Sequence, residues 1–410
     1  MAIIKNISPN AKTISSILTL RYNPTKTSLI SKLSWRDFTT KKIKNDPVST
    51  VEKLLIKKIK HEIKNQKSSV SLALSGGIDS TLSLVLLRKC FPKINISTIS
   101  VKFADSPDET KRAEKIAKKF GADTEILYIE NFFNELPKAL SIVKLPFWDL
   151  HWYYVVKKAK LLSKILVSGD GGDELFGGYS FRYEKFLRLI NKNSKPEDKV
   201  KAYLKCHERD WVPDQNKLFG PKVKFSWTGI HNLLKHYFDN SLEPLAQVFL
   251  ADFNGKLLYN WIPLYSKIND HFKVKQISPL LSEEMISFAT HISPNLKYDI
   301  KNNTGKLILR QLLKKHVSSK FITRSKQGFA INTINLWNSS GKKMCKYYLD
   351  NARITEDGWI NPIWIKSHLK KLESEQNVRY VNKFFGLLAF EIWYRLFITK
   401  EIKPNTKLVV

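Results

Sequence analysis

The sequence predicts an α/β protein in which a doubly wound parallel sheet is followed by a mostly helical C-terminal half. Short apolar stretches alternate with helical patterns between residues 46 and 182, and strands that alternate with helices pair in parallel. Beyond Tyr183 the strand signals fade and helical patterns dominate. We therefore expect an α/β core over 46–182 and a helical part over 183–400, with flanking segments at 1–45 and 401–410.

Each element of the core has its own local signal. Apolar residues between Val51 and Ile63 recur at helical spacing, with lysines largely on the other face, which predicts an amphipathic helix. Gly121 predicts the end of a later helix. In chain order the sequence predicts a helix over 51–63, a strand over 70–74, a helix over 81–88, a strand over 97–103, a helix over 109–120, a strand over 125–129, a helix over 153–162 and a strand over 165–167.

Two glycine-rich segments directly follow predicted strands. The first is SGGIDS at 75–80, and the second is SGDGGDELFGGY at 168–179. In open α/β sheets, ligands bind beyond the carboxyl ends of the strands. Gly76 and Gly77 allow the backbone to approach an anion closely, and the helix that follows directs its N-terminus at the same anion. The first segment therefore indicates a phosphate cradle.

The acidic residues of these segments indicate a magnesium site. Asp79 beside a phosphate is repulsive unless a cation lies between the two groups. Mg²⁺ binds one or two carboxylates together with phosphate oxygens. Asp173 and Glu174 in the second segment can supply the other side of the ion. We expect Mg²⁺ to be held by Asp79 and Asp173.

The two segments together resemble the synthetase domain of the asparagine synthetase family, within the PP-loop ATP pyrophosphatases. Other stretches are similar to further motifs of this family: GKLILR at 305–310, RSKQGF at 324–329 and the closing helix at 387–397. The resemblance covers roughly residues 50 to 400. It implies a sheet of the adenine-nucleotide alpha-hydrolase type.

The resemblance implies a reaction in two halves. A carboxylate, aspartate or a related acid, attacks ATP and forms an acyl-adenylate with release of pyrophosphate; ammonia or an amine then forms the amide and AMP. ATP and Mg²⁺ are the implied cofactors. Lys326 is implied to face the charge that develops on the phosphates, and Asp170 to orient or deprotonate the amine. The residues expected at the adenine and ribose are Leu74, Val101, Ser168 and Gly169, and those expected around the phosphates are Ser75, Gly76, Gly77, Asp79 and Ser80.

The sequence departs from the family pattern on the acceptor side. Many relatives carry R-V-P-F-L-D, with a glutamate two residues before the arginine. Here Ile277 replaces the arginine, Ser282 the last aspartate and Lys275 the glutamate. Lys144-Leu145-Pro146 stands where many relatives have D-E-P. We therefore expect an altered acceptor pocket or an altered scaffold around it.

The source of nitrogen is a separate question. Residues 1–45 look like the last stretch of a glutaminase domain, and we expect the rest of that domain to be missing from this sequence. The family's glutaminase nucleophile is an N-terminal cysteine, whereas this chain starts Met1-Ala2 and its first cysteine is Cys90. We expect the nitrogen donor to be free ammonia, a larger amine, or ammonia delivered by a separate glutaminase subunit. A homodimer is the expected self-assembly.

Composition bounds the remaining alternatives. The chain carries 69 lysines and arginines against 37 acids, a net charge of +32. This positive charge has two possible explanations: a polyanionic partner such as tRNA, or charged faces that are simply solvated. Because the lysines are spread along the whole chain, we do not expect a nucleic-acid partner. Three scattered cysteines predict a reducing compartment, the cytoplasm, and no segment predicts a membrane span. A tRNA-modifying PP-loop enzyme and a degenerate, non-catalytic binding module remain as alternative functions.

Overall fold

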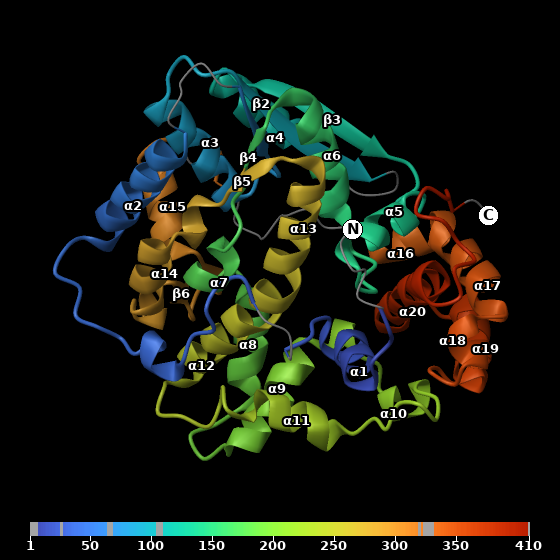
Figure 1. The fold of residues 1–410 in the computed structure, drawn as a ribbon. Helices are drawn as coiled ribbons and strands as arrows, with labels where there is room; N and C mark the ends of the chain where they lie inside the picture. Colours follow the sequence, from blue (N-terminus) through green and yellow to red (C-terminus); the bar gives the residue numbers. More distant parts are fainter. Residues whose placement is uncertain are drawn as a thin grey trace.

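A five-stranded parallel sheet forms the upper part of the molecule (Figure 1). The computed structural model describes residues 7–24, 28–63, 69–103, 110–318, 321–322 and 332–408. The strand order is β3-β2-β1-β4-β5, and every pair in the sheet is parallel. The strands are β1 (Val70–Ala73), β2 (Ile96–Phe103), β3 (Asp123–Ile129), β4 (Ile165–Val167) and β5 (Lys275–Ile277).

Helices cover both faces of this sheet, which confirms the doubly wound prediction. Successive residues of β1 point to opposite faces. Leu72 accordingly packs into a buried cluster with α2 and α3, whereas Ala73 packs into a second cluster with α5 and α6. The helices of the α/β part are α2 (Pro47–Glu62), α3 (Ile78–Cys90), α4 (Thr110–Lys119), α5 (Leu136–Val143) and α6 (His151–Leu162).

The strand β5 corrects the expectation that strands end at residue 167. It returns to the sheet after about a hundred residues of helical chain and pairs with β4, so that Val167 lies opposite Ile277. The amide of Lys275 donates to the carbonyl of Lys164 at 2.7 Å. The helical chain between β4 and β5 comprises α7 (Gly172–Phe176), α8 (Ser180–Leu189), α9 (Pro196–Cys206), α10 (Gln215–Leu218), α11 (Trp227–Lys235), α12 (Pro244–Asp252), a π-helical turn at Phe253–Trp261 and α13 (Ile262–Phe272).

The chain after β5 is almost entirely helical, as predicted. A two-stranded antiparallel ribbon, β6 (Tyr298–Asp299) and β7 (Thr304–Gly305), is the exception among the described residues. The helices are α14 (Glu283–Thr290), α15 (Leu307–Lys314), α16 (Thr333–Leu336), α17 (Lys342–Asp350), α18 (Arg353–Glu356), α19 (Pro362–Ser374) and α20 (Val378–Phe397). In Figure 1, α16–α20 pack together at one side of the molecule, while α14 and α15 lie beside α2.

The N-terminal segment is built into the fold. Helix α1 (Ala11–Leu20) contacts α20 and buries most of its C-terminal half. The carbonyl of Leu18 accepts hydrogen bonds from the amide of Gln215, at 3.0 Å, and from the ammonium of Lys383. Arg21, which follows the helix, forms an ion pair with Asp149. Whether this segment is a glutaminase remnant stays a prediction.

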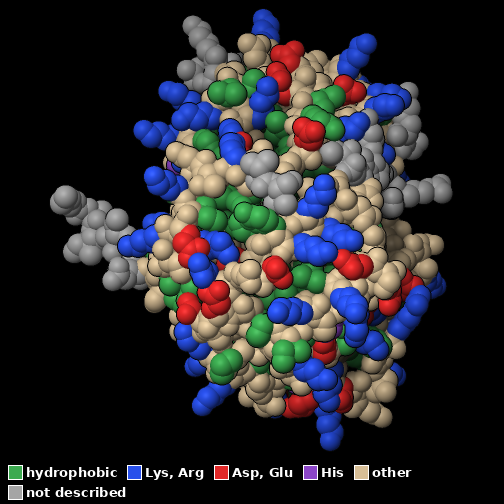
Figure 2. Space-filling view, turned by 90° about the vertical axis from the view of Figure 1, so that its right-hand side faces the viewer, with side chains coloured by type: hydrophobic (Ala, Val, Ile, Leu, Met, Phe, Trp, Pro, Cys, Tyr) green, Lys and Arg blue, Asp and Glu red, His purple; other side chains and the backbone are tan. Residues whose placement is uncertain are grey.

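The surface is basic without a single dominant patch on the face shown in Figure 2, where lysines and arginines are scattered among acids and apolar groups. The aromatic residues Trp148, Trp152 and Tyr153 are buried, which places them in the core. Within the described ranges, no helix has the length and apolar character that crossing a membrane requires.

Candidate functional site

The first glycine segment forms a tight turn between β1 and α3. Gly76 has a φ of +72°, a conformation that favours glycine. The turn is fixed by its own hydroxyls: the amide of Gly77 donates to Ser75 Oγ at 3.3 Å, and the amide of Ser75 donates to Ser80 Oγ at 3.3 Å. Helix α3 begins at Ile78, so Asp79 lies in its first turn, beside the N–H groups that an anion would face.

The second glycine segment approaches the first closely because it lacks side chains at the contact. A Cβ on Gly172 would lie 2.4 Å from Cγ of Asp79, and a Cβ on Gly169 would lie 2.8 Å from Cβ of Asp79. Any larger residue at either position would push the two segments apart. These glycines therefore bring the start of α7 against Asp79, and Asp173 comes with it.

Asp79 and Asp173 share one cation in this structure. The ammonium of Lys306 forms an ion pair with Asp79, and its Nζ lies 2.8 Å from Oδ1 of Asp173. Burial lowers the pKa of Lys306, but the charges of Asp173 and Asp79 outweigh burial and raise it above its usual value. Two carboxylates within reach of a single cation are also the donor set that Mg²⁺ prefers. The residues thus fit the predicted metal site.

Asp170 stands in a polar network at the carboxyl ends of β4 and β5. Its Oδ2 accepts hydrogen bonds from Ser168 Oγ at 2.8 Å and from Gln276 Nε2 at 2.6 Å. Ser278 Oγ lies 2.9 Å from Ser168 Oγ, and Asn269 Nδ2 donates to Gln276 Oε1 at 2.5 Å. Burial raises the pKa of Asp170 to about 6, against the two hydrogen bonds that lower it. A carboxylate with this pKa can accept a proton near neutral pH.

The three departures noted between residues 275 and 282 lie in scaffold positions. Lys275 is on the surface and pairs with Glu62 at 2.8 Å. Ile277 is buried in the core. Ser282 caps α14, since its hydroxyl accepts from the amide of Met285 at 3.3 Å, a role that aspartate fills equally well. The side chains of this stretch that face Asp170 are instead Gln276 and Ser278.

An aromatic wall lies on the same side of the sheet. Trp152 and Tyr265 stack with ring centroids 4.7 Å apart, and Tyr265 Oη lies 3.4 Å from Nε2 of His151. Burial raises the pKa of the Tyr265 hydroxyl well above its usual value, and the negative charge of Asp170 adds to the effect. Tyr265 was not predicted as a site residue. The sequence offered only its proximity, ten residues, to the stretch that starts at Lys275.

The predicted nucleotide residues gather at the carboxyl edge of the sheet. Leu74 is buried, and its carbonyl accepts from Ser100 Oγ at 2.8 Å. Val101 is partly buried in β2, the strand next to β1. Ser168 and Gly169 begin the second segment. Lys326 lies outside the described residues, so its role stays a prediction.

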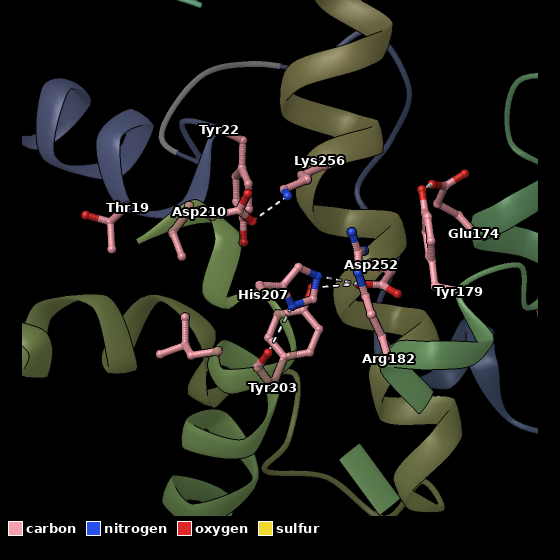
Figure 3. Close-up of a pocket in the computed structure, with 12 residues that line it drawn as sticks. Thr19, Tyr22, Glu174, Tyr179, Arg182, Tyr203, His207, Asp210, Asp252 and Lys256 are labelled. Atoms are coloured by element: carbon pink, nitrogen blue, oxygen red, sulfur yellow. Dashed lines mark hydrogen bonds and ion pairs between the residues drawn. The ribbon is translucent and has the colours of Figure 1, made fainter. Parts of the chain in front are cut away.

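A small polar pocket with a cavity volume of about 20 Å³ lies behind the second segment (Figure 3). Tyr179 of the segment donates to Glu174, and Arg182 stacks on the Tyr179 ring at 4.2 Å. Tyr203 Oη donates to Asp252 at 2.8 Å, and Lys256 forms an ion pair with Asp210. These side chains contact one another, and through Tyr179 and Glu174 they hold the second glycine segment in place.

The fold and the glycine segments define the class of α/β PP-loop proteins. The model of the asparagine synthase family matches residues 50–395, and the chain belongs to this family. It is 25% identical over 407 residues to "Asparagine synthetase [glutamine-hydrolyzing] 1" of Bacillus subtilis, a match that covers 88% of this chain and 62% of that protein. A "Putative asparagine synthetase [glutamine-hydrolyzing]" of Mycobacterium bovis is 22% identical over 372 residues, covering 82% and 56%.

The chain thus spans less than two thirds of the length of these two relatives. Among solved structures, it is similar to the NH3-dependent NAD synthetase of Campylobacter jejuni, with a TM-score of 0.25 and 20% identity over 33% of this chain and 62% of that chain. The NMN synthetase of Francisella tularensis gives a TM-score of 0.23 and 13% identity over 60% of this chain and 94% of that chain.

The Asp170 network leads to a first prediction. Gln276→Leu removes a hydrogen bond that stabilises the charged form of Asp170, so the pKa of Asp170 should rise above its present value of about 6, by roughly one unit. Carboxyl ¹³C NMR titration measures this shift, with Asp170→Asn identifying the resonance. Gln311→Leu, at an exposed position of α15, is the matched control. An unchanged pKa in Gln276→Leu would contradict the network.

Proposed function

We propose that this chain is an ATP-dependent ligase that activates a carboxylate as its adenylate and converts it to an amide. The observation that carries the proposal is the pair of carboxylates, one from each glycine segment, that share one cation beside the turn at Gly76. Adenylation expels a highly charged pyrophosphate, and this chemistry needs cations and backbone N–H groups at the leaving group. Family membership supports the same reaction class.

The proposed reaction balances in two steps. A carboxylate oxygen of the acid attacks the α-phosphorus of ATP, and the bond to pyrophosphate breaks. The nitrogen of ammonia or an amine then attacks the acyl carbon, and AMP leaves. The proton lost by the nitrogen passes to Asp170, whose pKa of about 6 suits a base at neutral pH.

The residues of the chain divide this work between two sides of the sheet edge. The turn at Gly76–Gly77 and the start of α3 bind phosphate through backbone N–H groups. Asp79 and Asp173 would hold Mg²⁺, which when bound neutralises charge on the leaving pyrophosphate. Ser168, Gln276 and Ser278 position Asp170 on the acceptor side.

The experiment that tests the proposal is ATP–pyrophosphate exchange against a panel of carboxylic acids, with aspartate first. We expect exchange with at least one acid, and AMP with pyrophosphate as the nucleotide products once an amine is added. ADP and phosphate as products would contradict adenylation. Turnover that depends on added RNA would favour the tRNA-modifying alternative, and no exchange with any acid would favour a non-catalytic binding module.

A further prediction concerns the nitrogen donor. The glutaminase nucleophile that the family resemblance implies is an activated cysteine thiolate. Burial raises the pKa of all three thiols of this chain: that of Cys206 to about 12, and those of Cys90 and Cys345 above their usual value. We therefore expect the purified 410-residue chain to release glutamate from glutamine only at the background rate, while ammonium salts support amide formation.

Glutamate release, measured enzymatically, does not depend on knowing the acid substrate. Release well above background, abolished by a Cys90→Ser substitution, would contradict this prediction. We propose that ammonia reaches the chain free or from a separate glutaminase subunit; adding candidate subunits to the same assay separates these two sources.

A further inference from the structure

Lys306 occupies the centre of the proposed metal site. It immediately follows β7 and stands at the N-terminal end of α15 with a φ of +58°. Its side chain is nearly buried, and its ammonium bridges Asp79 of α3 and Asp173 of α7. One lysine thus links the two glycine segments through the same carboxylates that the proposed function assigns to Mg²⁺.

The protein backbone holds this lysine in place. The amide of Lys306 donates to the carbonyl of Phe176 at 3.0 Å, at the end of the helix that carries Asp173. A Cβ on Gly178 would lie 1.7 Å from Oδ1 of Asp173 and 2.5 Å from Cε of Lys306, so the glycine makes room for the ion pair. The contact is therefore a packed feature of the site, with little freedom for the lysine stem to lie elsewhere.

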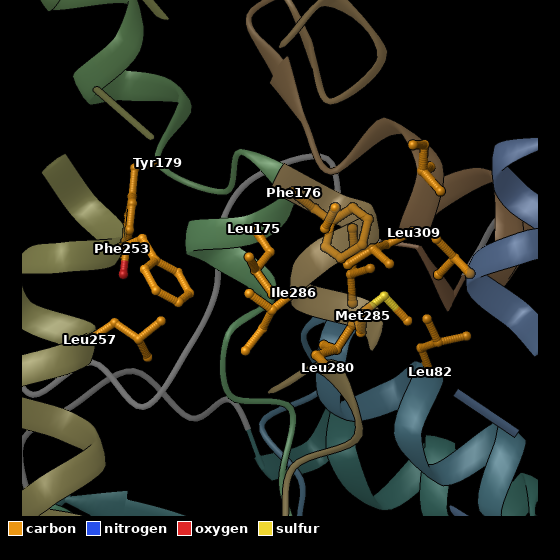
Figure 4. Packing of buried hydrophobic residues seen from close by; sticks show 14 of the residues in the cluster. Leu82, Leu175, Phe176, Tyr179, Phe253, Leu257, Leu280, Met285, Ile286 and Leu309 are labelled. Atoms are coloured by element: carbon orange, nitrogen blue, oxygen red, sulfur yellow. The ribbon is translucent and has the colours of Figure 1, made fainter. Parts of the chain in front are cut away.

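The apolar core beneath the ion pairs fixes the spacing of the three elements. Figure 4 shows Leu82 of α3, Leu175 and Phe176 of α7 and Leu309 of α15 packed with Met285 and Ile286 of α14. Because α3, α7 and α15 each carry or adjoin one member of the charged cluster, this packing keeps the two carboxylates at a distance that a single cation can bridge. Only the charged ends of the side chains are free to exchange partners.

The charges of Lys306 and the two carboxylates determine how Mg²⁺ can enter the site. Lys306, Asp79 and Asp173 together carry one positive and two negative charges in a site with little solvent, where like charges repel strongly. Two further charges act on them: Arg310 on Asp79, and Asp170 on both carboxylates. Mg²⁺ between the carboxylates would face the ammonium at close range. The ammonium can yield its place only if another anion accepts it, and a nucleotide bound at the adjoining turn of Gly76 brings such an anion in its phosphates.

We propose that Lys306 is a positioning residue, a built-in counter-ion that holds Asp79 and Asp173 ready for Mg²⁺ and releases them only when nucleotide phosphate is present. This inference rests on the proposed function, since it takes Mg²⁺ and ATP as the ligands of the site. It goes further in stating an order: divalent cation alone binds weakly, and cation with nucleotide binds well. Bound Mg²⁺ therefore enters together with the phosphates that it must neutralise.

The test uses Mn²⁺, a spectroscopic substitute for Mg²⁺, in titrations followed by electron paramagnetic resonance. Without nucleotide, we expect Lys306→Met to bind Mn²⁺ at least about tenfold more tightly than the wild type, because the competing charge is gone. A merely structural lysine would give the opposite sign. Lys301→Met, at an exposed position in the β6–β7 turn, is the matched control, and Lys306→Met/Asp79→Asn should lose the gain.

The wild type alone provides a second readout that does not depend on a variant. Its affinity for Mn²⁺ should rise at least about tenfold in the presence of α,β-methylene ATP, and this rise should be smaller in Lys306→Met. Equal affinity of the wild type with and without the nucleotide analogue would overturn the proposal, as would equal or weaker Mn²⁺ binding by a folded Lys306→Met. Absence of ATP–pyrophosphate exchange would instead count against the proposed function and leave the Mn²⁺ result standing.

Discussion

Asp79→Asn and Asp173→Asn should each lower carboxylate-dependent ATP–pyrophosphate exchange by about 10³-fold, since a bound metal contributes several kcal/mol to this type of transition state. Each amide keeps the shape of the carboxylate but is a poor ligand for Mg²⁺. The fold should survive, because each single variant leaves Lys306 paired with the remaining carboxylate.

Exchange assays at saturating ATP, together with thermal melting, check this expectation. Asp239→Asn, at an exposed position, is the control and should retain full activity. The double variant Asp79→Asn/Asp173→Asn should melt well below either single variant, because it leaves the nearly buried ammonium of Lys306 without both of its carboxylates. Near-normal exchange in either single variant would show that the metal is held elsewhere.

Asp170→Asn should separate the two halves of the reaction. Amide formation should fall by about 10²–10⁴-fold, the usual contribution of a general base, while ATP–pyrophosphate exchange stays within a few-fold of the wild type. In the wild type, amide formation should decline as the pH falls below about 6, where Asp170 becomes protonated. When the concentration of neutral ammonia or amine is held constant across the pH range, this decline should be absent from Asp170→Asn. Equal loss in both half-reactions would contradict the assignment.

The same substitution should stabilise the folded protein. The pKa of Asp170 is raised from 3.8 to about 6 in the fold, so between these two values the native state binds more protons than the unfolded state, and stability from this group falls as the pH rises. At neutral pH the folded protein therefore loses at most about 3 kcal/mol by keeping this group charged. Asp170→Asn removes that cost, and its melting temperature should exceed that of the wild type at pH 7 more than at pH 4.

The sequence predicted the α/β part well because its strands and helices carry strong local signals. Val70–Ala73 is buried on both faces, and its sequence is an apolar run interrupted by a single serine. Strand β4 was predicted with its observed bounds. Strand β5 was missed because only Ile277 of its three residues is apolar. It is a strand through its backbone pairing with β4, and a pairing that spans a hundred residues leaves no local pattern.

The site shows the same division. Glycines with carboxylates at strand ends predicted that Asp79 and Asp173 lie together, and the structure places both within reach of one ammonium. Asp170 was named from the resemblance, and the roles of all three residues stay predictions. The motif at 305–310 contains Lys306, but no role was predicted for this lysine, because only the fold brings it between two acids. For Ser282 the sequence left an altered pocket and an altered scaffold open, and the structure places this residue in the scaffold, where its hydroxyl caps a helix.

Helix α1 shows that homology and cooperative folding set different boundaries in this protein. The family match starts at residue 50, yet Ile14, Ile17 and Leu18 lie deep in the core, and the Leu18 carbonyl satisfies two buried donors from distant helices. A recombinant fragment trimmed to the recognisable region, or a gene fusion joined there, would uncover apolar surface on α20 and leave the Lys383 ammonium with only its second acceptor, the carbonyl of Asp210. The smallest fragment that keeps this core intact therefore includes α1.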